Sequence, residues 1–145
     1  MGKDKYNVKA KSDHLTYEFI SEGPKGNITK IVVYQHMFDN FYNLAFGDFK
    51  NQHEILDDLI VSDNGDTAKV LATVASTLFD FFQHHKGTIV FAQGSTHSRN
   101  RLYRRYLSHF LDIITENFIL LGELDGKIER FKKGNDYTSF YIHKH

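Results

Sequence analysis

The segment FAQGSTHSRNRLYRRYL, residues 91–107, gathers more groups able to do chemistry than any other part of the chain. It contains four arginines, a Gly-Ser-Thr turn and no acidic residue, and it begins in a nearly all-apolar run typical of a buried strand. We expect a helix to begin after Gly94, with Ser95 or Thr96 as the N-cap residue. Because unpaired N–H groups and partial positive charge gather at a helix start, this turn predicts an anion-binding site with His97 beside it. Ordinary helix capping explains the same turn without a ligand.

Arg99 is the arginine of this segment that needs a partner. Helical phase places it near the centre of the apolar face, whereas Arg101 and Arg105 lie on the solvated face and Arg104 at its flank. A guanidinium that faces a core is costly unless it meets an anion. Two explanations stay open: Arg99 pairs with an acidic side chain of this chain, or it holds a phosphate or carboxylate of a ligand. The internal acids considered are Asp58, Asp63 and Asp66.

The nine histidines do not predict a metal site. His84 and His85 are adjacent and diverge on a helix, and His143 and His145 share a strand face without a third ligand. Cysteine is absent, which excludes disulfides, thiolate nucleophiles and Cys-ligated zinc. The aromatic run HMFDNFYNLAFGDF could stack nucleic-acid bases, but no basic residue interleaves with it, so we expect it to cover two sheet faces instead.

Length and charge predict one folded domain. The chain has 145 residues, equal numbers of basic and acidic residues and 41% hydrophobic residues. Residues 1–13 are expected to be a flexible N-terminal segment, and residues 14–145 a single α/β domain. Balanced charge gives no general attraction to nucleic acid or membrane, and no signal peptide or membrane span is evident. We therefore expect a cytoplasmic protein, whose oligomeric state and protein partners stay open.

Hydrophobic periodicity predicts the elements that carry these residues. The predicted fold class is α+β, with one mixed, mainly antiparallel sheet covered by two principal helices in the order β-β-β-α-β-α-β-β. Asp66 is the expected N-cap of the first helix, and residues 50–65 fit either a helix or a short strand. The strands are expected over residues 15–23, 27–37, 41–49, 88–93, 118–124, 127–131 and 137–144, and the helices over residues 66–85 and about 96–116.

Two motifs resemble a family of small uncharacterised bacterial proteins. These proteins share a KVLATVA-type helix, present here at residues 69–75, and a GST-x-x-R-x-x-LY element, present here at residues 94–103. The resemblance spans roughly residues 15–142. It implies a common fold and carries no activity.

The order of elements also resembles the core of the GCN5-related N-acetyltransferases. In that family an Asn-x-x-Ala-x-x-Leu-Tyr pattern opens the helix after the central strand, and the matching positions here are Thr96, Arg99, Leu102 and Tyr103. The resemblance implies Tyr103 as a general acid for the departing thiolate. The family's coenzyme A loop falls on residues 62–67, where Asp63 and Asp66 would repel a pyrophosphate. Coenzyme A is therefore a disfavoured cofactor.

These observations lead to one functional hypothesis and two alternatives. We expect the chain to bind a phosphorylated or otherwise anionic ligand at Gly94, Ser95, Thr96, His97 and Arg99. The alternatives are an acyl-CoA-dependent N-acyltransferase and a non-catalytic module that binds a protein or RNA. Whether the chain is an enzyme stays open.

Overall fold

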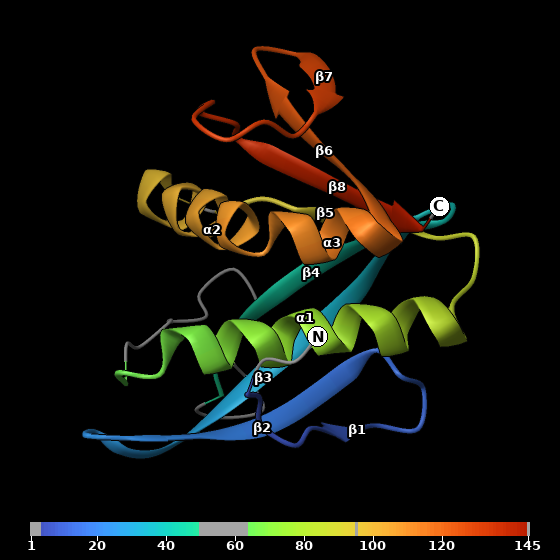
Figure 1. Ribbon diagram of the computed structural model, residues 1–145. Helices are drawn as coiled ribbons and strands as arrows, with labels where there is room; N and C mark the ends of the chain where they lie inside the picture. The colour runs from blue at the N-terminus through green and yellow to red at the C-terminus, as the bar shows by residue number, and fades with distance from the viewer. Residues whose placement is uncertain (1–3, 50–63, 95, 145) are drawn as a thin grey trace. The chain divides into compact units, whose positions relative to one another are not determined.

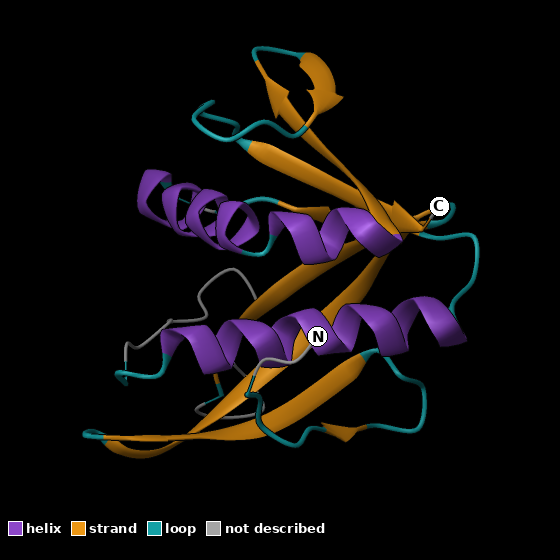
Figure 2. Cartoon of the chain, viewed as in Figure 1, coloured by secondary structure: helices purple, strands orange, loops and turns teal. Residues whose placement is uncertain are grey.

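The computed structural model describes residues 4–49, 64–94 and 96–144, which form one open sheet with helices packed against it (Figures 1 and 2). The sheet order is β1-β2-β3-β4-β5-β8-β6-β7. β4 and β5 pair in parallel, whereas β1–β2, β2–β3, β5–β8, β8–β6 and β6–β7 pair antiparallel. The predicted mixed, mainly antiparallel sheet is confirmed. The strands are β1 (Lys9–Ala10), β2 (Thr16–Gly23), β3 (Gly26–Phe38), β4 (Phe41–Asp48), β5 (Ile89–Ala92), β6 (Phe118–Leu124), β7 (Lys127–Arg130) and β8 (Ser139–Lys144).

Three helices occur within the described residues: α1 (Thr67–His84), α2 (His97–His109) and α3 (Leu111–Asn117). The prediction of a single helix over residues 96–116 was wrong, because the backbone leaves helical geometry at Phe110, with φ −105° and ψ 14°. Neither proline nor glycine marks this break in the sequence. Residues 50–63 lie outside the described part of the chain. No helix in the described part is long and apolar enough to cross a membrane.

The chain divides into two compact units. The first lies within Met1–Gln35 and Leu44–Lys86, and the second comprises His36–Asn43 and Gly87–His145. β3 and β4 each contribute residues to both units.

The core of the first unit lies between α1 and one face of β2 and β3. Tyr17 and Val32 are paired across the two strands and are fully buried. Tyr34 stacks on Phe81 of α1 with 4.2 Å between ring centroids, and its hydroxyl is 2.8 Å from Thr77 Oγ1. Aromatic side chains therefore join the helix to the sheet in this unit.

The core of the second unit lies beneath α2 and α3. Tyr103 of α2 packs edge-on against Phe140 of β8, and both residues are buried. Gly122 of β6 lies under the ring of Tyr137, where an added Cβ would come within 2.5 Å of the ring. Glycine is therefore required at this position for the ring to lie flat on the sheet.

Candidate functional sites

The predicted anion site lies in the second unit, where β5 leads into α2. Gly94 is buried, and its N–H donates to Asn100 Oδ1 at 2.7 Å. Asn100 N–H donates in turn to the carbonyl oxygen of Thr96 at 3.0 Å. The Gly94 N–H group, which the sequence suggested as part of an anion cradle, thus has a partner within the chain.

The remaining predicted residues are only partly described. Thr96 and His97 are exposed at the beginning of α2. Ser95 and the side chain of Arg99 lie outside the described part of the structure, so the partner of Arg99 stays a prediction. Asp66, one of the acids considered for it, lies in the first unit and accepts hydrogen bonds from Tyr6 and Ser21 at 2.5 and 2.6 Å.

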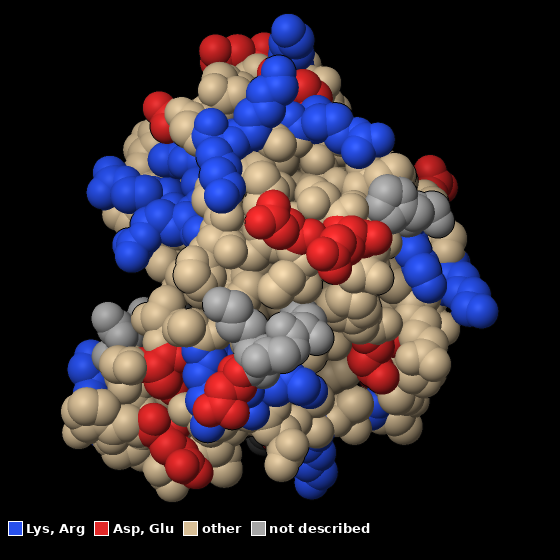
Figure 3. All heavy atoms as spheres, in the orientation of Figure 1, with Lys and Arg blue, Asp and Glu red and all other residues tan. Residues whose placement is uncertain are grey.

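The described basic residues of α2 form a regular pattern. His97, Arg101, Arg105 and His109 recur at every fourth position, which places them along one side of the helix, and all four are exposed. We call this set the basic stripe of α2. Figure 3 shows Lys and Arg gathered over α2 and Asp and Glu over α3. α3 contains Asp112 and Glu116, which lie outside the stripe.

Arg104, at the flank of the stripe, has a structural role. Its Nη1 donates to the carbonyl oxygen of Tyr137 at 2.9 Å, and its Nη2 lies 3.9 Å from Asp136 Oδ1. Within the described residues Arg101 and Arg105 form no such ion pair. The stripe therefore presents arginines that no described carboxylate neutralises.

The loop before α1 uses its polar side chains internally. Asn64 is 1% exposed, accepts a hydrogen bond from Lys25 N–H at 2.8 Å and donates to the carbonyl oxygen of Gly26 at 2.9 Å. Asp66 stands at the N-cap position as expected, but its carboxylate does not cap the helix, because it accepts hydrogen bonds from Tyr6 and Ser21 instead. The resemblance of this loop to a coenzyme A site stays a prediction.

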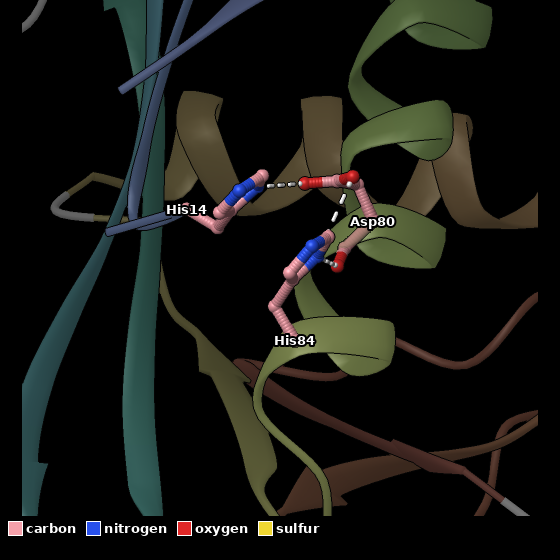
Figure 4. Close-up of side chains that lie close together, drawn as sticks. All are labelled: His14, Asp80 and His84. Atoms are coloured by element: carbon pink, nitrogen blue, oxygen red, sulfur yellow. Dashed lines mark hydrogen bonds and ion pairs between the residues drawn. The ribbon is translucent and has the colours of Figure 1, made fainter. Parts of the chain in front are cut away.

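A second cluster of chemical groups lies in the first unit, at the last turns of α1 (Figure 4). His14 Nδ1 donates to Asp80 Oδ2 at 2.8 Å. His84 Nδ1 donates to the main-chain carbonyl oxygen of Asp80 at 2.9 Å and lies 3.6 Å from its Oδ1. The two imidazole rings stack with centroids 3.6 Å apart. The three side chains are 30%, 35% and 40% exposed, so ions in solution reach them.

A buried tyrosine orients the Asp80 carboxylate. Tyr17 donates its hydroxyl proton to Asp80 Oδ2 at 2.6 Å, and the same oxygen lies 3.1 Å from the carbonyl of His14. Burial raises the pKa of the Asp80 carboxyl, but hydrogen bonds from Tyr17 and His14, with the charge of both imidazoles, lower it further, so the pKa ends below its usual value. Asp80 is therefore a carboxylate at neutral pH.

The turn that carries His14 is held in an unusual conformation. His14 has φ 55°, a left-handed value that is uncommon for residues other than glycine. His14 N–H donates to the carbonyl oxygen of Lys11 at 2.9 Å, and His85 Nε2 donates to that of Asp13 at 2.9 Å. These bonds hold the turn against the end of α1.

Comparison with known proteins identifies the family. A family model matches residues 2–145. The chain belongs to DUF6934. DUF6934 is a family of unknown function, so the expected membership of an uncharacterised family is confirmed while no reaction is assigned. No curated protein and no solved structure matches the chain.

In this DUF6934 chain the sequence interpretation did not bring His14 and Asp80 to one place. They are 66 residues apart, and the positive φ that turns His14 toward α1 has no glycine to announce it. One signal was present: Asp80 and His84 are four residues apart and so lie on the same face of a predicted helix. The pairing of His84 with His85 drew attention away from it.

Proposed function

We propose that the chain binds an extended ligand with several phosphate groups along the basic stripe of α2. The observation that carries this proposal is the recurrence of four exposed basic residues at every fourth position from His97 to His109. Successive members are separated by about 6 Å along the helix axis, so the stripe is about 18 Å long. A row of cations of this length suits a chain of phosphates better than a single anion.

The stability of α2 by itself supports the same proposal. Like charges four residues apart destabilise a helix by a few tenths of a kcal/mol per pair, and Arg101 and Arg105 are such a pair. The first turn of α2 contains no acidic residue, so basic side chains lie near the positive end of the helix dipole. A bound polyanion relieves both repulsions. Thr96 at the helix start and Arg99 in its first turn are the residues by which the predicted anion site would extend the stripe.

Binding of a fluorescently labelled single-stranded oligonucleotide, followed by anisotropy at several salt concentrations, tests the proposal. We expect R101Q/R105Q to weaken binding and to reduce the slope of log affinity against log salt by about 2, or about 1 for each lost phosphate contact. The matched control is K9Q/K11Q, which removes the same charge from exposed lysines of the first unit. Equal loss in both variants, or no binding by the unchanged chain at low salt, would contradict the proposal.

Two further arms separate the alternatives. Arg99→Met is expected to weaken binding without loss of stability if this arginine contacts the ligand, and to lower the melting temperature if it pairs within the chain. Thermal stabilisation by pyrophosphate but not by the oligonucleotide would indicate a small phosphorylated ligand. Thermal stabilisation by coenzyme A would instead favour the N-acyltransferase alternative, in which Tyr103 would be the acid.

A further inference from the structure

We propose that His14, Asp80 and His84 bind a divalent transition-metal ion, with zinc as the ion that fits best. Each residue offers one ligand atom, and the three atoms lie within 4.8 Å of one another. Asp80 and His84 project from the same side of α1, and His14 meets them from the turn before β2 (Figure 4). All three belong to the first unit, so this site is independent of the basic stripe of α2.

The distances between ligand atoms suit one small ion. Zinc binds imidazole nitrogen at about 2.0 Å and carboxylate oxygen at about 2.1 Å, so two such atoms on one tetrahedral ion lie about 3.4 Å apart. The distance from His14 Nδ1 to Asp80 Oδ2 is 2.8 Å, and that from His84 Nδ1 to Asp80 Oδ1 is 3.6 Å. The separations differ from the tetrahedral value by only a few tenths of an ångström, which side-chain rotation can supply.

The kinds of ligand atom select the class of metal. Two imidazole nitrogens with one carboxylate oxygen suit zinc and its transition-metal neighbours, whereas calcium and magnesium prefer oxygen ligands alone. Three protein ligands leave one tetrahedral position for water or another small ligand, as in zinc sites that are not purely structural. The site thus has the composition of an accessible zinc site.

Groups around the ligands hold them in place. The Tyr17 hydroxyl fixes Asp80 Oδ2 from the buried side, an arrangement by which outer hydrogen bonds orient metal ligands. The Asp13 carboxylate accepts the Leu15 N–H at 3.0 Å and so helps to hold the His14 turn. Metal binding would replace two hydrogen bonds, one from each imidazole to Asp80, and release the protons that now occupy the Nδ1 atoms.

Isothermal titration of the tag-free chain with Zn²⁺ tests the site directly. We expect one strong site per chain, and we expect H84A to lower its affinity at least tenfold. The matched control is H36A, which removes an exposed histidine outside the cluster. Cobalt substitution provides a second readout, because the visible absorption of bound Co²⁺ reports tetrahedral coordination.

The competing explanation is a purely structural cluster that fastens the His14 turn to α1. That explanation predicts that H84A and the unchanged chain bind zinc equally weakly, and either this result or the absence of a one-to-one site would overturn the proposal. Circular dichroism of metal-free H84A and H14Q checks folding, and H14Q gives a second variant should H84A not fold. Thermal stabilisation by Zn²⁺ but not by Mg²⁺ is the expected result for the unchanged chain.

Discussion

At the scale of single residues, the least expected feature is a lysine inside the core of the first unit. Lys30 is 2% exposed, and its Nζ donates to Asp48 Oδ1 at 2.5 Å. Lys30 follows the same alternation as Val32 and Tyr34, whose side chains are buried beside it. A charged residue on the buried face of β3 disguised that face, so the sequence interpretation assigned Ile31 and Val33 to it instead.

The ion pair of Lys30 with Asp48 makes a sharp prediction about stability. Lys30→Met leaves a buried carboxylate without its cation, and we expect the free energy of unfolding to fall by about 3 to 5 kcal/mol. The double variant K30M/D48L removes both charges and is expected to recover most of that loss. Urea denaturation measures both values, with K11M as the control at an exposed lysine. Equal destabilisation in the single and double variants would show that the pair contributes packing and not charge compensation.

At the scale of elements, sequence patterns predicted types better than connections. The strands and α1 follow from alternation and from the spacing of apolar residues, and Gly87, with φ 76°, follows the end of α1 as expected. The division between α2 and α3 was not predicted, because Phe110 continues the apolar spacing through the break. The Asn100 side chain that fastens the beginning of α2 looks like an ordinary helical residue in the sequence. Its partner is a main-chain group, which no residue pattern reveals.

Asn100 provides a test of how α2 is positioned. Asn100→Ala leaves the buried Gly94 N–H without its acceptor, and we expect a loss of about 1 to 3 kcal/mol in the free energy of unfolding. Asn100→Asp keeps an acceptor oxygen and is expected to lose less. Thermal denaturation of the two variants is the measurement. If the alanine variant were as stable as the unchanged chain, water or another group would have to satisfy Gly94.

At the scale of the whole molecule, the important fact is that β3 and β4 continue from one compact unit into the other. The sequence predicted a single domain over residues 14–145, and that prediction is not tested by the division into units. Two long strands shared by both units favour joint unfolding, since melting either unit removes pairing partners from the other. The sequence contains no Pro-, Gly- or Ser-rich linker that would allow the units to separate.

Hydrogen exchange measures this coupling. We expect Lys30→Met, in the first unit, to speed exchange of the slowest amides of β6 and β8 in the second unit by the same free energy as those of β2. Acceleration confined to the first unit would mean that the two units unfold separately. Arg104→Gln, in the second unit, gives the reciprocal experiment, because it removes the bond to the Tyr137 carbonyl.

The Asn64 side chain has a practical consequence for labelling the protein. Two hairpins end in two-residue turns, Pro24–Lys25 between β2 and β3 and Asp125–Gly126 between β6 and β7. The first turn is fastened through Lys25 and Gly26 to Asn64, 38 or 39 residues away, so an inserted peptide there would disrupt the beginning of α1. An added Cβ at Gly126 meets no described atom within 4 Å. A fluorophore or affinity tag therefore belongs in the β6–β7 turn, although both turns look equally open in the sequence.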